Sequence, residues 1–108
     1  MSQAKQISGE EQFAAALGGA QPCVVDFWMA GCPACARLAP VFGELAEELG
    51  DRADLVGIEA RENMAIAQKY GIRGVPTVIV FKAGEEVQRS VGAKDKDELR
   101  AWLEPTLV

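Results

Sequence analysis

The sequence predicts one α/β domain whose sheet is largely parallel with an antiparallel edge. Three apolar, β-rich runs alternate with two helical patterns, at residues 23–28, 32–49, 54–58, 63–70 and 77–81. Helices between strands require crossover connections, which join parallel strands. The chain has 108 residues, the size of one compact domain. We therefore expect a single domain over residues 1–108.

The first expected element is a short helix. Ser8 and Glu11 stand at the spacing of a capping box, in which both side chains bond backbone N–H groups at a helix start. Apolar and small residues follow at 13–17, and Gly18 with Gly19 ends the helix. The next run, residues 23–28, has little polar alternation, which predicts a strand buried on both faces.

A loop over residues 29–31 leads into a long helix from about Cys32 to Leu49. Its apolar residues recur at helical spacing, at Leu38, Val41, Phe42, Leu45 and Leu49. Pro40 lies inside this pattern and predicts a kink, and Gly50 ends the helix.

The second half of the chain predicts two more apolar strands separated by a helix. The strands are residues 54–58 and 77–81, and the second has the strongest strand pattern in the chain. The helix between them, residues 63–70, is short and ends at Gly71.

A hairpin and a final helix complete the expected order. Residues 83–85 are typical of a hairpin turn, and residues 87–91 alternate as a half-exposed strand. Asp95 and Glu98 repeat the capping-box spacing before the last helix. The apolar face of that helix consists of Leu99, Trp102 and Leu103.

Composition excludes several classes of function. The chain has no histidine, which removes Ser-His-Asp and Cys-His catalysis, histidine-ligated metal sites and imidazole pH switching. The net charge is −5 and no Lys/Arg cluster is present, which argues against nucleic-acid binding. No run approaches the roughly 20 apolar residues of a membrane span, and residues 1–10 hold no signal-peptide core. We therefore expect a cytoplasmic protein without membrane contact, because thiols stay reduced there.

A cysteine pair carries the chemistry. Cys32 and Cys35 flank Pro33 and Ala34 at the start of the long expected helix. Residues three apart on a helix have Cβ atoms about 5–6 Å apart, whereas a disulfide needs about 3.5–4.5 Å. A bond here needs local tightening and stays reducible, which suits a shuttling disulfide. Pro33 fits the first helical position, and the helix N-terminus favours the thiolate of Cys32.

Other interpretations of the cysteines remain open. The pair is also half of a zinc-site pattern, but a closed zinc site takes four cysteine or histidine ligands, and this chain has three cysteines. Two incidental core cysteines are a further alternative. Cys23 lies on the first apolar strand, where a small buried hydrophobe is the favoured interpretation over a redox partner.

Asp26 interrupts the same strand. A buried carboxylate is costly and tends to take up a proton, with a raised pKa. If strand and helix pack as expected, Asp26 lies behind the cysteine pair and exchanges the proton of Cys35. The alternative is a structural role, in which Asp26 caps a turn or contacts a backbone N–H.

From residue 24 to residue 103 the chain resembles the thioredoxin family. The matching pieces share order and close spacing: Val24-Val25-Asp26-Phe27-Trp28, Cys32 and Cys35, Ala39-Pro40, Tyr70-Gly71-Ile72-Arg73-Gly74-Val75-Pro76-Thr77, Phe81-Lys82-Ala83-Gly84 and Val91-Gly92. A CxxC by itself is a weak signal, but with the Val-Pro-Thr strand entry and Gly92 it is specific.

The resemblance implies the thioredoxin fold, a central mixed sheet flanked by helices on both faces. It implies a thiol–disulfide oxidoreductase in which Cys32 is the nucleophile, Cys35 resolves the mixed disulfide and Asp26 handles the proton. It also implies a cis Val75–Pro76 peptide and an apolar docking surface. The residues expected at this surface are Trp28, Gly31, Pro33, Gly74, Val75, Pro76 and Gly92.

Partners follow from the same resemblance. We expect disulfide-containing proteins as substrates, a reductase of the thioredoxin reductase type as electron source, and a monomer. No bound cofactor or metal is needed, since the dithiol carries two electrons.

The chain also departs from the family. Gly31 stands where a tryptophan usually precedes the nucleophile, and the proline has moved to the first position between the cysteines. Residues 55–59 offer no lysine beside Asp26. Pro33 therefore leaves a more oxidising disulfide oxidase or isomerase as one alternative. A module that binds a metal or iron–sulfur cluster through Cys32 is another.

Overall fold

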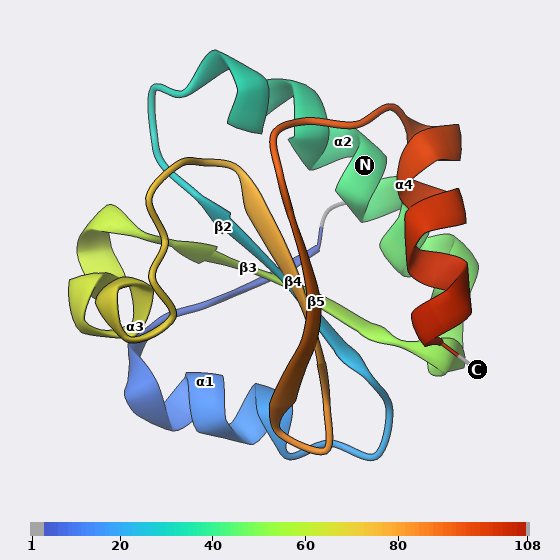
Figure 1. The fold of residues 1–108 in the computed structure, drawn as a ribbon, viewed down its shortest axis with the longest axis horizontal. Helices are drawn as coiled ribbons and strands as arrows, with labels where there is room; N and C mark the ends of the chain where they lie inside the picture. Colours follow the sequence, from blue (N-terminus) through green and yellow to red (C-terminus); the bar gives the residue numbers. More distant parts are fainter. Residues whose placement is uncertain (1–3, 108) are drawn as a thin grey trace.

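Strand β2 (Cys23–Trp28) lies at the centre of a five-stranded sheet (Figure 1). The structure is a computed structural model that describes residues 4–107. The other strands and the helices are β1 (Lys5–Ile7), α1 (Gly9–Leu17), α2 (Pro33–Leu49), β3 (Asp54–Glu59), α3 (Met64–Lys69), β4 (Thr77–Lys82), β5 (Glu85–Val91) and α4 (Lys96–Leu103). No helix among the described residues is long and apolar enough to cross a membrane.

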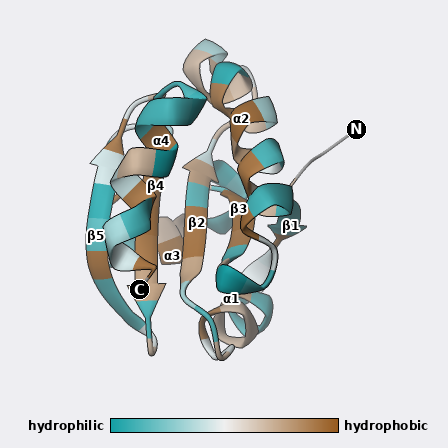
Figure 2. Ribbon diagram, turned by 90° about the vertical axis from the view of Figure 1, so that its right-hand side faces the viewer, coloured by the Kyte–Doolittle hydropathy of each residue, from teal (hydrophilic) through white to brown (hydrophobic). Residues whose placement is uncertain are grey.

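The sheet is mixed, with the strand order β1-β3-β2-β4-β5. In Figure 2 these strands run from β5 on the left to β1 on the right. Strands β1, β3 and β2 pair in parallel, whereas β4 pairs antiparallel with both β2 and β5. The expectation of a largely parallel sheet is therefore wrong at β4. Helix α3 has only six residues, about 9 Å of rise, which is too short to carry the chain back along the sheet.

Most of the expected elements form where the sequence predicted them. The central strands β2 and β4 are buried along almost their whole length. Helix α2 runs through Pro40 and ends at Gly50, which has a positive φ of 52° that suits glycine. Helix α4 has the predicted capping box, in which Asp95 and Glu98 bond each other's backbone N–H groups over 2.8 and 3.1 Å.

The N-terminal region differs from the prediction in two ways. Strand β1 was not predicted, because its three residues include one buried side chain and show no strand pattern. The predicted capping box of Ser8 and Glu11 is also wrong. The side chain of the buried Asn63 accepts the backbone N–H of Gly9 over 2.8 Å, and Gln12 accepts that of Ser8 over 3.0 Å.

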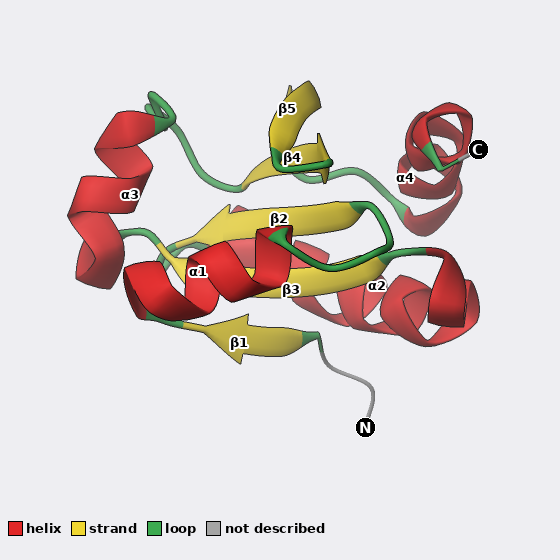
Figure 3. Ribbon diagram, turned by 90° about the horizontal axis from the view of Figure 1, so that it is seen from below, coloured by secondary structure: helices red, strands yellow, loops and turns green. Residues whose placement is uncertain are grey.

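Two apolar cores lie on opposite faces of the sheet, and Figure 1 shows α2 with α4 on one side and α1 with α3 on the other. The first core joins the sheet to α2 and α4 through Val24, Leu38, Phe42, Leu45, Val78, Leu99 and Leu103. The second joins it to α1 and α3 through Phe13, Val25, Phe27, Ile58, Ile66 and Phe81. The twist of the sheet between these layers is visible from below in Figure 3.

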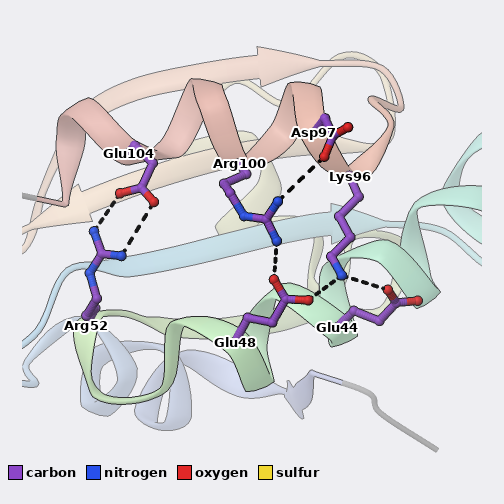
Figure 4. A network of polar contacts seen from close by, with 7 residues as sticks. All are labelled: Glu44, Glu48, Arg52, Lys96, Asp97, Arg100 and Glu104. Carbon is purple, nitrogen blue, oxygen red and sulfur yellow. Dashed lines mark hydrogen bonds and ion pairs between the residues drawn. The ribbon is translucent and has the colours of Figure 1, made fainter.

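Ion pairs join α2 to α4 outside the first core (Figure 4). Glu48 on α2 pairs with both Lys96 and Arg100 on α4. Arg52, just after α2, pairs with Glu104 over 2.5 Å. These contacts fix the outer edge of α4 against the helix that carries the cysteine pair.

Candidate active site

The cysteine pair lies where the central strand passes into α2. Gly31 has a positive φ of 83°, and the next residue, Cys32, is the N-cap of α2. Pro33 occupies the first helical turn, where its missing N–H leaves no hydrogen bond unmade. The Sγ of Cys32 accepts a 3.2 Å hydrogen bond from the backbone N–H of Cys35. The helix start thus presents N–H groups directly to one of the two sulfur atoms.

The two thiols have opposite electrostatic environments. The pKa of Cys32 is lowered by a hydrogen bond from the Cys35 thiol, by the backbone N–H groups of Cys35 and Ala34, and by the charge of Arg37, against some desolvation. Cys35 is buried, with 4% of its surface exposed. Burial first, and then the Cys32 sulfur, raise the pKa of Cys35 to about 11. Near neutral pH the sulfur of the half-buried Cys32 is therefore easier to ionise than that of the buried Cys35.

Asp26 lies beneath this pair in the middle of the sheet. Only 5% of its surface is exposed, and its Oδ1 is buried without a hydrogen-bond partner. Desolvation raises its pKa from 3.8 to about 7. Asp26, Cys32 and Cys35 line one cavity of about 340 Å³. Among the described residues, no turn or backbone N–H donates to this Oδ1, in contrast to what the structural alternative expects.

The loop before β4 approaches Cys32 from the other side. The Val75–Pro76 peptide is cis, the isomer that the resemblance implied. The carbonyl oxygen of Val75 lies 3.9 Å from the Sγ of Cys32. Gly92 donates its N–H to the carbonyl oxygen of Pro76 over 2.8 Å, which joins the end of β5 to this loop. Figure 1 shows the loop before β4 at the same end of the sheet as the start of α2.

Four of the seven expected docking residues line two hollows at this end of the sheet. Trp28 and Gly31 line the cavity that also contains Asp26. Gly74 and Val75 line a second hollow of about 460 Å³, with Met64 and others. Met29 lines both hollows, while Pro33, Pro76 and Gly92 line neither.

Two residues at the site were missed by the sequence analysis. The carboxylate of Glu59 accepts backbone N–H groups of Ala30, Arg61 and Glu62, the first over 3.0 Å, so it fixes the loop before Cys32. These hydrogen bonds, that of Ala30 first, lower the pKa of Glu59. Gln6 accepts the indole N–H of Trp28 over 2.8 Å. The sequence signals neither role, because both depend on contacts between distant segments.

Within residues 4–107, no group of three or more His, Cys, Asp or Glu side chains is arranged to hold a metal ion. Cys23 lies away from the pair, on the face of β2 that packs against the second core. Burial, with a smaller effect of the Asp54 charge, raises the pKa of Cys23 to about 12.

Comparison with known proteins decides the family. The model of the thioredoxin family matches residues 4–105. This chain belongs to the thioredoxin family. It is similar to a thioredoxin of Rhodospirillum rubrum, with 38% identity over 107 residues that cover 99% of this chain and 100% of the relative. It is also 44% identical to a thioredoxin of Bacillus subtilis (strain 168) over 77 residues, 71% of this chain and 74% of that protein.

Solved structures agree with this assignment. The thioredoxin of Malassezia sympodialis superimposes with a TM-score of 0.89 at 32% identity, covering 100% of this chain and 94% of that one. A mutant thioredoxin from Halobacterium salinarum NRC-1 gives a TM-score of 0.90 at 33% identity, covering 98% and 92%. The fold is therefore the thioredoxin fold, as the resemblance implied.

Membership of the thioredoxin family establishes the activity. The protein is a thiol–disulfide oxidoreductase with protein-disulfide reductase activity, and Cys32 with Cys35 is its redox pair. Oxidation of this dithiol to a disulfide releases the two electrons that reduce one substrate disulfide.

Proposed function

We propose that Cys32 is the nucleophile and Cys35 the resolving thiol of this reductase. The Cys32 thiolate attacks one sulfur of a partner disulfide, and the other partner sulfur leaves with the electron pair of the broken bond. Cys35 then attacks the Cys32 sulfur of the mixed disulfide, which forms the Cys32–Cys35 disulfide and releases the second partner sulfur. The observation that carries these roles is the hydrogen bond from the Cys35 N–H to the sulfur of Cys32, the less buried of the two cysteines.

Asp26 is the proton acceptor of the second step. Cys35 has a pKa near 11 and is a thiol at neutral pH, so it must lose a proton before it attacks. Asp26 lines the same cavity and has a pKa of about 7, so its carboxylate form is available at neutral pH. A base whose pKa lies near the working pH is well suited to proton transfer.

The substrate docks across the cysteine pair and the loop before β4. The docking surface comprises Trp28, Gly31, Pro33, Gly74, Val75, Pro76 and Gly92. The contact between Val75 and the Cys32 sulfur supports this location, since a chain segment that reaches the sulfur also meets the Val75 backbone. The hollow beside Val75 adds the apolar surface of Met64, whose side chain is 57% exposed.

A thioredoxin reductase returns the electrons, and the protein works as a monomer in the cytoplasm. Family membership supports a reductase of this type. Gly31, at the position where the family usually has a tryptophan, makes the docking surface smaller next to Cys32. We therefore expect affinity for a reductase to depend more on the loop before β4.

Trapping the mixed disulfide tests the assigned roles. The Cys35→Ser variant, incubated with a protein disulfide such as insulin, accumulates a covalent adduct through Cys32. The matched Cys32→Ser variant forms none, and the wild type turns over with NADPH and a thioredoxin reductase. The assignment would be wrong if the Cys32→Ser variant formed an adduct through Cys35 as fast as the Cys35→Ser variant forms its adduct through Cys32.

A further inference from the structure

Three neighbouring strands place Gln6, Gly57 and Asp26 in one row across the sheet. Gln6 is paired with Gly57 in the β1–β3 register, and Asp26 with Gly57 in the β2–β3 register. In-register residues of parallel strands point to the same face, which here is the face under α2. Gly57 has no side chain, so nothing from β3 separates the side chains of Gln6 and Asp26.

The amide of Gln6 fills the space above Gly57. A Cβ at position 57 would lie 2.4 Å from the Nε2 of Gln6 and 2.8 Å from its Oε1. The Oε1 accepts the indole N–H of Trp28 over 2.8 Å. The Nε2 has one hydrogen bond, to the carbonyl oxygen of Ala4, at the long distance of 3.5 Å. Because an amide nitrogen carries two hydrogens, one N–H of Gln6 has no acceptor among the residues that the structure describes.

The unused donor and an unused acceptor face one cavity. Gln6 and Asp26 both line the cavity of about 340 Å³, and the Oδ1 of Asp26 is the buried oxygen without a partner. This volume is far above the space that one water molecule needs, and the site offers the polar partners that a buried water requires. A water between the amide and the carboxylate would satisfy both groups.

We propose that Gln6 is a positioning residue for the resolving step: its amide N–H, acting through water in this cavity, stabilises the ionised carboxylate of Asp26. The inference rests on the proposed role of Asp26. A hydrogen bond to the charged form of an acid lowers its pKa. Without this amide the carboxylate would ionise at a higher pH, and a smaller fraction of Asp26 would be able to accept the Cys35 proton at neutral pH.

Few other groups compete for this effect. On α2, Cys35 and the N-cap Cys32 are the titratable side chains that line the cavity, and no Lys or Arg side chain among the described residues lines it. Arg37 is exposed and acts on Cys32. On β3, Glu59 is occupied by backbone N–H groups. Lys5 pairs with Val56 on the opposite face of β1, and on β4 Asp26 faces the apolar Val78.

Two substitutions reach the same contact from different sides. Gln6→Met removes the amide from an exposed side chain of similar length. Gly57→Ala keeps the amide but places a Cβ where the amide lies, and the flexible end of Gln6 moves away easily.

A third variant separates the two hydrogen bonds of the amide. Gln6→Glu keeps the acceptor for the indole N–H of Trp28 and removes the N–H donor. Gln21→Met is the matched control, because Gln21 precedes the start of β2 and does not line the cavity.

The experiment measures the pKa of Asp26 by carboxyl NMR in the reduced protein, and the pH profile of the resolving step in single turnover. In Gln6→Met and Gly57→Ala the pKa rises by about one unit, a tenfold change in ionisation. The rate profile moves by the same amount, Gln6→Glu shifts both at least as far, and Gln21→Met shifts neither.

The outcomes separate this inference from the proposed function. An unchanged pKa in Gln6→Met and Gly57→Ala would overturn the role of Gln6 alone, because Asp26→Asn still tests Asp26 directly. A raised pKa with an unchanged rate profile would overturn the role of Asp26 in the resolving step, and with it that of Gln6.

Discussion

The backbone N–H of Cys35 donates a 3.2 Å hydrogen bond to the Sγ of Cys32. Cys35 therefore acts on the pair in two ways: its backbone N–H bonds the Cys32 sulfur, and its buried thiol has a pKa raised to about 11. The same helix start lowers the pKa of Cys32, while burial raises that of Cys35. The proposed order, attack by Cys32 and then resolution by Cys35, rests on this difference between two sulfur atoms of one helical turn.

The three cysteines should react with iodoacetamide in a fixed order. Near pH 7 the reduced native protein is labelled first at Cys32, because its thiol is accessible and its pKa is lowered. Cys35 follows slowly. Cys23, with 1% of its surface exposed and a pKa near 12, is labelled only after unfolding. Peptide mass spectrometry over time gives the order, and faster labelling of Cys35 would contradict the assignment.

Asp26→Asn should stabilise the protein in a pH-dependent way. Folding raises the pKa of Asp26 from 3.8 to about 7, so the native state binds more protons than the unfolded state between these values. Wild-type stability is then lost as pH rises, at about 1.4 kcal/mol per pH unit and by at most about 4 kcal/mol. The asparagine variant lacks this loss. Its advantage grows between pH 4 and pH 7 and stays constant above.

Urea unfolding at pH 4, 7 and 8 measures this difference, and single-turnover kinetics measure the accompanying slower resolving step. A variant that is less stable than wild type at pH 8 yet fully active would show that Asp26 is a structural group.

The sequence predicts the parts of the fold that depend on local pattern. The β2 run is continuous and apolar, and the capping box of Asp95 lies within four residues, so both appear as expected. The orientation of β4 depends on the length of α3, which apolar periodicity does not specify. The start of α1 depends on Asn63, 54 residues from Gly9, and local spacing favoured Glu11 instead.

At the site, too, the features that depend on local sequence can be predicted, whereas those that depend on distant segments cannot. Cys32 and Cys35 lie within one helical turn, so their spacing already indicates a redox pair. Asp26 is conspicuous as a charge in an apolar run. The contact of Gln6 with the Asp26 cavity needs the register of three strands, of which β1 has no strand pattern of its own. No property of Gly57 in the sequence indicates that a distant amide lies above it.

Glu48→Gln should weaken the contact between α2 and α4 (Figure 4). Hydrogen bonds from Lys96 and then Arg100 lower the pKa of Glu48, so its stabilising effect is present above the unfolded pKa and is lost as pH falls through the folded one. At pH 7 and low salt the variant therefore melts slightly below wild type. At 1 M salt the difference disappears, because exposed ion pairs are screened.

Glu47→Gln is the matched control, since Glu47 is the exposed neighbour on α2 without an ion pair in the described structure. Thermal unfolding at both salt concentrations compares the variants. An equal decrease for Glu47→Gln would mean that total charge, and not the ion pairs of Glu48, sets the effect.

The order of the residues between the cysteines should determine how oxidising the protein is. The N–H groups of Ala34 and Cys35 lower the pKa of Cys32, and Pro33 has no N–H of its own. The double substitution Pro33→Gly with Ala34→Pro restores the family order and removes the Ala34 N–H. We expect the pKa of Cys32 to rise and the redox potential to fall together. Pro33→Gly alone keeps the Ala34 N–H and should change both values less.

The two quantities are tied by their energies. A change of about 30 mV in this two-electron couple corresponds to roughly 1.4 kcal/mol, which is also the energy of one pKa unit. Equilibration with glutathione gives the potential, and the thiolate absorbance gives the pKa. A wild-type potential well above about −270 mV would favour the more oxidising oxidase or isomerase role. If the potential moves by tens of millivolts while the pKa of Cys32 stays fixed, the effect lies in the oxidised state, and stabilisation of the thiolate by Ala34 is not its cause.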